Sequence, residues 1–224
     1  MELVKTGKFK DVYKLPDGNY LLKFKDTVPQ RLTCESETCG GSVTGPVEGT
    51  GANALKMSVY FFDLVKNANI PTHFISADLS KNEMIVQPAK LFGNGLKFVL
   101  RYKAEGCFIR RFGAYSKEGD PLPKIFEVIL KDDARGNPPA AKEILMALNL
   151  LSHSQFDEIH DKTVRICDIV YEDLKNRGLE LFDIKVEFGI ADGKVALIDE
   201  ISARNMRVFK DSKKLDSLTI SGLF

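Results

Sequence analysis

The stretch "LFDIKVEFGIADGKVALIDE", residues 181–200, has the pattern of a strand, a turn and a second strand. In its first half large apolar residues alternate with charged ones, and Asp183, Lys185 and Glu187 recur at every second position. Successive side chains of a strand point to opposite faces, so these three charges share one face. That face is either exposed to solvent or lines a site.

The turn between the two strands decides whether two carboxylates of this hairpin meet. Asp192-Gly193 is a hairpin turn signal. A two-residue turn would pair Glu187 with Ile198 and put Asp199 on the opposite face, whereas an odd-numbered loop would bring Glu187 and Asp199 to one face. We therefore expect an odd loop.

Two neighbouring carboxylates repel each other unless a cation lies between them. Mg²⁺ with bound phosphate is the natural occupant of such a pair, because Mg²⁺ prefers oxygen ligands. The alternative is a solvated strand face of ion pairs, which the spacing alone does not exclude.

The composition is that of an ordinary soluble globular protein, with 44% hydrophobic and 28% charged residues among 224. The formal net charge of +1 gives no global reason to expect a nucleic acid or an anionic membrane as partner. No apolar run approaches the roughly 20 residues of a spanning helix, and the charged N-terminus does not resemble a signal peptide. We expect a cytoplasmic protein.

The cysteines support this expectation. Cys34 and Cys39 have the spacing C-x4-C, while Cys107 and Cys167 are solitary, and no histidine stands at metal-ligand spacing from them. A zinc site is therefore not expected. A disulfide between Cys34 and Cys39 is geometrically open, but a cytosolic chain of this size does not need one.

The order of the expected elements predicts an α+β fold. Strands come first, helices late and a hairpin last, without the strand–helix alternation of a parallel sheet. Strands are expected at 8–15, 20–26, 74–75, 83–92, 96–104 and 124–134, with Asn94-Gly95 as the turn before the fifth. Helices are expected at 54–69, 108–115, 139–151 and 154–178, the last ending near Gly178. Residues 29–53 are rich in Gly, Ser, Thr and Pro and predict a long loop that is mobile without ligand.

Several motifs together resemble the SAICAR synthetase family, ATP-dependent ligases of purine biosynthesis that join aspartate to carboxyaminoimidazole ribotide. The most specific is "DIKVEFG" at 183–189, followed by "DE" at 199–200 and "SARNMRVF" at 202–209. Weaker matches, in the family's order, are "TGKFKDVY" at 6–13, "NANIPTHF" at 67–74, "LRYKAEGCFIRRFG" at 100–113 and "LKDDA" at 130–134. The resemblance covers nearly the whole chain.

The resemblance implies a site residue by residue. It implies that Gly7, Lys8 and Lys10 cradle the ATP phosphates, with Lys131 also on the nucleotide side. It implies catalytic roles for Lys185, Glu187 and Asp199, the two acids binding Mg²⁺ directly or through water. Lysines at positions i and i+2 of a strand share one face, and the neighbouring glycine lets the backbone approach phosphates. Lysines are also common on exposed edge strands, where their charge prevents pairing with another chain.

On the substrate side the resemblance implies that Arg101 and Arg207 hold the ribotide 5′-phosphate. This side also departs from the family pattern. Ser202 is kept, but Arg204 stands where the family has Asp, Cys107 where it has Ser, and Gly136-Asn137-Pro138 where it has His-Asp-Pro. Cys107, Ser202 and Arg204 are therefore further candidate substrate-binding residues.

Three functions fit these observations. The first is SAICAR synthesis, in which ATP phosphorylates the ribotide carboxylate and the aspartate amine attacks the acyl phosphate. The second is a related ligase with another carboxylate or amine, which the added cation Arg204 favours. The third is a non-catalytic nucleotide-binding protein, against which the full set of lysines and acids argues.

The resemblance also implies an architecture with ATP in a cleft between two subdomains. Residues 1–90 would form an antiparallel-sheet subdomain that covers the nucleotide, and residues 91–224 an α+β subdomain that binds the ligands and the metal. A homodimer is an expectation inherited from the family. The histidines His73, His153 and His160 are expected at the surface or in loops and not as catalysts.

Overall fold

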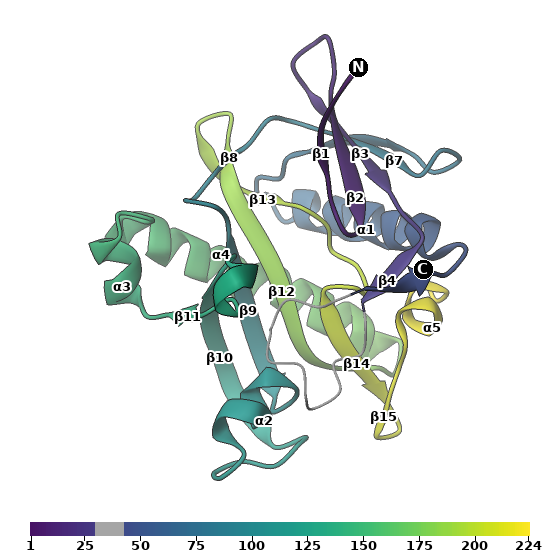
Figure 1. Ribbon diagram of the computed structural model, residues 1–224. Coiled ribbons are helices and arrows are strands. Elements are labelled where there is room, and N and C mark those ends of the chain that lie inside the picture. Colours follow the sequence, from purple (N-terminus) through teal and green to yellow (C-terminus); the bar gives the residue numbers. More distant parts are fainter. Residues whose placement is uncertain (30–42) are drawn as a thin grey trace.

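The computed structural model describes residues 1–29 and 43–224 and consists of two antiparallel sheets with helices packed against them (Figure 1). The small sheet has the order β1-β2-β3-β7-β6. Its strands are β1 (Glu2–Thr6), β2 (Lys10–Lys14), β3 (Tyr20–Phe24), β6 (Phe74–Asp78) and β7 (Glu83–Val86). A separate pair is formed by β4 (Thr27–Pro29) and β5 (Val43–Pro46).

The large sheet has the order β11-β10-β9-β12-β14-β15, and β13 and β8 also pair with β12. Its strands are β8 (Lys90–Leu91), β9 (Leu96–Lys103), β10 (Pro121–Leu130), β11 (Pro139–Ala140), β12 (Glu180–Ala191), β13 (Lys194–Ile198), β14 (Met206–Lys210) and β15 (Lys213–Lys214). The helices are α1 (Thr50–Asn67), α2 (Cys107–Phe112), α3 (Lys142–Ala147), α4 (His153–Asn176) and α5 (Ser217–Ser221), with a 3-10 turn at Asp133–Arg135.

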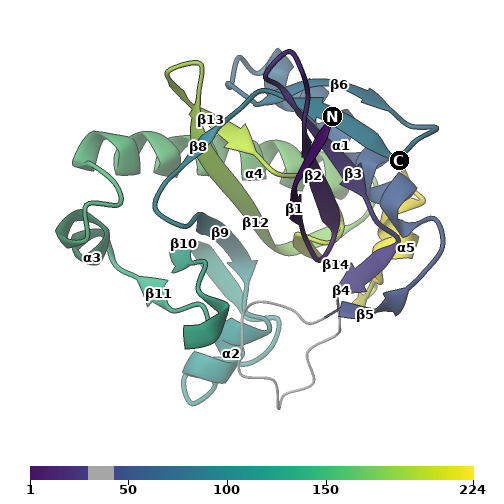
Figure 2. The same cartoon turned by 45° about the horizontal axis from the view of Figure 1, so that its top comes forward.

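The large sheet has one apolar face, which packs against α4 (Figures 1 and 2). Side chains of this face contact the helix, as in the stacked pair Tyr102 and Tyr171 and the edge-on pair Phe126 and Phe156. The alternate residues of β9 and β12 on this face are fully buried: Phe98, Leu100, Ile184 and Val186. The charged residues of the same strands therefore lie on the opposite face.

One hydrophobic core connects the two sheets. Leu22 and Phe24 of the small sheet belong to the same buried cluster as α1 and the apolar face of the large sheet. Phe62 of α1 stacks on Phe74 of β6 with ring centroids 5.2 Å apart. Because this core is continuous, it fixes the N-terminal strands relative to the large sheet.

The α+β class and most elements are confirmed. Helix α4 begins with a capping box in which Ser152 accepts from the backbone of Gln155 and the Gln155 side chain accepts from the backbone of Ser152. It ends before Gly178, which has a φ of 72°. No helix within the described parts of the chain is both long and apolar enough to cross a membrane.

Two predictions about the elements were wrong. Residues 43–53 are not an irregular loop, because they include β5 and the start of α1. The segment 83–92 is not one strand: β7 and β8 belong to different sheets, and β8 pairs with β12 and not with β9. Pro88 lies between them and cannot donate a ladder hydrogen bond. Cys34, Cys39 and most of the predicted mobile loop fall outside the described residues.

We predict that Phe98→Ala lowers the free energy of unfolding by about 3–5 kcal/mol, because it leaves a cavity between the large sheet and α4. The Phe98 ring is fully buried against the rings of Phe126 and Phe188. Urea denaturation measures the change. The control is Tyr115→Ala, which truncates a side chain that is 93% exposed and leaves stability within about 0.5 kcal/mol. Equal effects of the two changes would contradict the packing described here.

Candidate functional site

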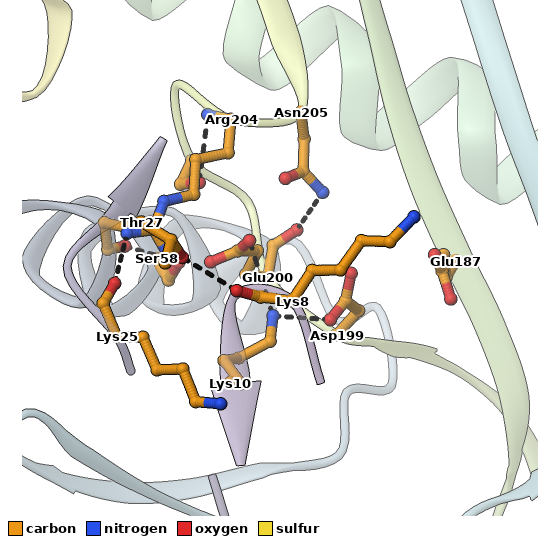
Figure 3. Close-up of polar contacts among 12 residues, drawn as sticks. Lys8, Lys10, Lys25, Thr27, Ser58, Glu187, Asp199, Glu200, Arg204 and Asn205 are labelled. Carbon is orange, nitrogen blue, oxygen red and sulfur yellow. Dashed lines mark hydrogen bonds and ion pairs between the residues drawn. The ribbon is translucent and has the colours of Figure 1, made fainter. Parts of the chain in front are cut away.

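Two lysines of the N-terminal hairpin reach acids of the second half of the chain: the acid that Lys8 contacts lies in the 3-10 turn after β10, and the acid that Lys10 contacts lies just beyond the β12–β13 hairpin. Lys8 lies in the turn between β1 and β2, and its Nζ is 3.1 Å from Asp133 Oδ2. Lys10 begins β2, and its Nζ is 2.5 Å from Asp199 Oδ1 and 3.4 Å from Glu200 Oε1 (Figure 3). A Cβ on Gly7 would lie 2.5 Å from the carbonyl oxygen of Lys10, so the turn requires glycine here.

Asp199 is the acid on which this contact depends. Burial alone would raise its pKa, but the ammonium groups of Lys10 and Lys185 outweigh burial and hold the pKa of Asp199 well below its usual range. His73, in the connection between α1 and β6, is buried and places Nε2 3.2 Å from the backbone oxygen of Asp199. Asp199 therefore stays ionised and its backbone is held from the core side.

Glu187 forms the second acidic centre. It is 5% exposed, and Lys131 Nζ lies 2.8 and 3.1 Å from its two carboxylate oxygens. Burial alone would lower the pKa of Lys131. The negative charges of Glu187 and Asp199 outweigh burial, so that the pKa of Lys131 is raised. Glu187 in turn contributes to the raised pKa of Lys10. The two acids thus act on the same lysines, and the structure brings them to one place.

The route by which the acids meet differs from the prediction. The hairpin has the two-residue turn Asp192-Gly193, and Glu187 pairs with Ile198, so the expected odd loop was wrong. Asp199 lies just beyond β13 with a φ of 69°. Because the chain leaves the strand conformation there, the alternation of faces no longer applies to Asp199.

The two acids suit a hard cation only together with a further oxygen donor. Within the described parts of the chain no group of three or more His, Cys, Asp or Glu residues could hold a metal ion. Mg²⁺ commonly binds to one or two carboxylates and completes its shell with water and substrate phosphates. Glu187 and Asp199 fit that pattern, and the ammonium group of Lys10 lies against Asp199.

Lys97 also belongs to this site, although the sequence analysis did not select it. It lies on β9 opposite Glu187, is 8% exposed and donates from Nζ to Asn137 Oδ1 at 3.2 Å. Burial, followed by the neighbouring Lys185 charge, lowers the pKa of Lys97 to about 8. The sequence did contain a signal for Lys97. In "LKFVLR" at 96–101, Lys97 and Arg101 are an even number of residues apart and so share one strand face, as Asp183, Lys185 and Glu187 do.

Arg101 stands at the centre of a second charged cluster on the same face. It is 1% exposed, and its guanidinium donates to Glu127 Oε2 at 2.5 Å, Asp183 Oδ2 at 2.6 Å and Cys107 Sγ at 3.2 Å. Arg207 on β14 also binds Asp183. Three of the predicted substrate-binding residues, Arg101, Cys107 and Arg207, are therefore brought together.

A cavity of about 130 Å³ lies next to this cluster and is lined by Cys107, Arg110, Arg111 and Asn137 among others. Arg111 donates to the other oxygen of Glu127 at 2.5 Å. Asn137 also contacts Lys97, so the cavity borders both charged clusters.

Ser202 and Arg204 lie elsewhere, at the junction with the N-terminal strands. Ser202 is fully buried, and its Oγ accepts from the backbone of Arg204 at 3.2 Å. The Arg204 side chain donates to the carbonyl oxygen of Lys25 at 2.7 Å (Figure 3). It also packs over the Phe9 ring. Within the described residues, Arg204 Nη1 and Glu200 Oε2 are buried without a hydrogen-bond partner.

We predict that Arg101→Met lowers the free energy of unfolding by about 3–5 kcal/mol, because it leaves the Glu127 and Asp183 carboxylates buried without their central cation. Urea denaturation without ligands measures the loss. Arg135→Met is the control, since that side chain is 78% exposed and forms a surface ion pair with Asp132. A loss below about 1 kcal/mol would show that Arg101 does not neutralise this cluster.

His73 gives a prediction about pH. Burial lowers the pKa of His73 from 6.5 to about 4, so between these values the unfolded chain binds a proton that the folded chain does not. The stability that the neutral, buried His73 contributes to folding is fully present above pH 6.5. The free energy of unfolding then falls by about 3 kcal/mol as the pH drops toward 4. Urea unfolding in EDTA should show this extra loss in the wild type but not in His73→Gln. The control, the exposed His153→Gln, should behave as the wild type; equal slopes for all three would contradict the assignment.

Comparison with known proteins agrees with this geometry. The family model described as "SAICAR synthetase" matches residues 3–219. A phosphoribosylaminoimidazole-succinocarboxamide synthase of Clostridium tetani is 46% identical over 228 residues, covering 100% of this chain and 99% of the relative. One of Coprothermobacter proteolyticus is 31% identical, covering 97% and 88%.

Solved structures show the same fold. A SAICAR synthetase (Type-2) in complex with ADP superimposes with a TM-score of 0.84 at 27% identity, covering 95% of this chain and 87% of that one. The Type-1 SAICAR synthetase of Pyrococcus horikoshii gives a TM-score of 0.80 at 26% identity, with coverages of 92% and 87%. On the full-length family match and the shared fold, this chain belongs to the SAICAR synthetase family.

Proposed function

We propose that this protein is an ADP-forming ligase that joins L-aspartate to carboxyaminoimidazole ribotide. The observation that carries the proposal is that Lys10 contacts Asp199 and Lys131 contacts Glu187. These residues come from the N-terminal hairpin, the segment after β10, and the β12–β13 hairpin with the residue that follows it. Relatives of nearly the same length carry the name of this activity, and one related structure is a complex with ADP.

The reaction makes an amide from a free carboxylate and an amine. A ribotide carboxylate oxygen attacks the γ-phosphorus of ATP, ADP leaves, and an acyl phosphate forms. The aspartate amine then attacks the acyl carbon, inorganic phosphate leaves, and the amine loses a proton. Such chemistry depends mainly on positioning and on neutralising phosphate charge, so no protein nucleophile is required.

On the nucleotide side, we assign Gly7, Lys8 and Lys10 to the phosphates of ATP and Lys131 to the same region. Glu187 and Asp199 would hold Mg²⁺, which supplies charge neutralisation of the phosphates when bound. Lys185 lies on the same strand face as Glu187, two residues away, and is assigned to the reacting groups. We retain the division into a nucleotide-covering part, residues 1–90, and a ligand- and metal-binding part, residues 91–224.

On the substrate side, Arg207 is better placed than Arg101 to contact the ribotide phosphate. A quarter of its side chain is exposed, whereas Arg101 is enclosed by Glu127, Asp183 and Cys107. Arg101 would then orient Arg207 through their shared carboxylate, Asp183. Ser202 would position the segment that carries Arg204, and Cys107 would complete the guanidinium contacts of Arg101.

The alternative of a related ligase with other substrates is not favoured, because the similarity to named SAICAR synthases extends over the full chain. The added cation Arg204 contacts Lys25 and Phe9 and so has a structural explanation. A homodimer stays a prediction from the family, and a cytoplasmic location stays a prediction from the sequence.

The test is an ADP-release assay with Mg-ATP and carboxyaminoimidazole ribotide, with and without L-aspartate. We expect release that requires aspartate, is matched by succinocarboxamide product and stops when EDTA removes Mg²⁺. Absence of turnover in a protein that still binds Mg-ADP would reject these substrates. Unchanged turnover in EDTA would reject the metal assignment.

We predict that Glu187→Gln lowers kcat roughly 100-fold or more, because it removes one of two charges that hold the metal. Circular dichroism and the thermal midpoint check that the fold is retained. The control is Glu180→Gln at the start of the same strand, where the exposed carboxylate pairs with Lys103. Full activity of Glu187→Gln would remove Glu187 from the site.

A further inference from the structure

Two ammonium groups on the charged face of the large sheet lack an acidic partner. Lys8, Lys10 and Lys131 each have a carboxylate oxygen within 4 Å. Lys97 and Lys185 have none among residues 1–29 and 43–224. These two residues lie on the neighbouring strands β9 and β12.

The register places Lys97 and Lys185 side by side. Lys97 is paired with Glu187 and Lys185 with Val99, so the two lysines are diagonal neighbours on one face. Side chains at such positions reach each other in antiparallel sheets. The Lys185 charge acts on Lys97, as the lowered pKa of Lys97 reflects after the larger effect of burial.

A purely structural role does not explain Lys97. Its ammonium is nearly buried, and its hydrogen-bond partner is the neutral side-chain oxygen of Asn137, which also accepts from the backbone of Asp132. The cross-strand neighbour on the other side is the apolar Ile129. An apolar residue at position 97 would avoid the cost of desolvating a charge without an acidic partner.

An anion would satisfy both lysines. Asn137, the hydrogen-bond partner of Lys97, also lines the cavity, and the acids Glu187 and Asp133 near Lys97 are already paired with Lys131 and Lys8. An incoming oxygen anion therefore meets two ammonium groups whose neighbouring acids are engaged. We propose that Lys97 and Lys185 together bind an anionic oxygen group of the substrates, and that Lys97 is a substrate-binding residue of this chain.

This inference rests on the proposed function for the identity of the anion. Both a carboxylate and a phosphoryl group have the required chemistry, and they coexist in a reaction that phosphorylates a carboxylate. We expect the ribotide carboxylate, because Lys8 and Lys10 on the N-terminal hairpin already serve the nucleotide phosphates. Measuring the KM of each substrate separately distinguishes the two sources.

The experiment compares Lys97→Gln, Lys97→Arg and Lys103→Met. Glutamine keeps a donor for Asn137 but removes the charge, and arginine keeps the charge. Lys103 is the matched control, since it lies on the same strand and is already paired with Glu180 at 2.5 Å. For Lys97→Gln we expect a roughly 10- to 100-fold rise in the KM of the ribotide, most of which Lys97→Arg restores. Lys103→Met should leave both KM values unchanged.

A rise in the KM of ATP instead would also support the anion site and would identify the anion as phosphoryl. If Lys97→Gln folds and neither KM changes more than twofold, the inference is wrong and Lys97 only supports Asn137. If the wild type makes no SAICAR, the proposed function fails, and inorganic phosphate becomes the probe. The rise of the thermal midpoint with phosphate should then be lost in Lys97→Gln and kept in Lys103→Met; retention in both would overturn the anion site.

Discussion

The contact between Lys10 and Asp199 is the constraint on which the site depends, because it joins the second strand of the chain to the end of the β12–β13 hairpin. The Lys10 side chain is only 11% exposed, and desolvation offsets much of the attraction in such a pair. The pair is therefore not what brings the two sheets together. The continuous core through Phe24, α1 and the large sheet does that, and it holds the two charges in contact.

The charges in "DIKVEFG" are explained by a sheet that has helix α4 on one face and the charged clusters on the other. Asp183 and Glu187 are buried carboxylates, each bound by a cation from another strand or loop. In the arginine cluster each of these cations has a carboxylate partner, since Arg101 and Arg207 share Asp183 while Glu127 accepts from Arg101 and Arg111. In the lysine cluster Lys97 and Lys185 have no carboxylate oxygen within 4 Å among residues 1–29 and 43–224, and this contrast points to an anionic ligand beside them.

Much of this was predictable from local sequence. The alternation of charges indicated the shared face, and Gly178 marked the C-terminal end of α4. The length of the hairpin loop was predicted wrongly, because we assumed that Asp199 continues the strand. Asp192-Gly193 forms a two-residue turn, and Asp199 comes to the side of Glu187 because the backbone leaves the strand conformation after β13. The split of 83–92 between two sheets and the burial of His73 depend on long-range packing. Lys97 was missed because its importance comes from the pairing of β9 with β12.

The ion pairs of the site also bear on how ligands enter it. If Lys10 is separated from Asp199, or Lys131 from Glu187, one anion and one cation lose their partners. Free energy is lost for each unpaired charge that stays buried. A ligand of one sign satisfies only half of each pair. A divalent cation together with nucleotide phosphates would satisfy both halves, because Asp199 and Glu187 would hold the metal and Lys10 and Lys131 would bind the phosphates. The pairing therefore favours a nucleotide and a metal that bind together over either one alone, as the proposed ligase reaction requires.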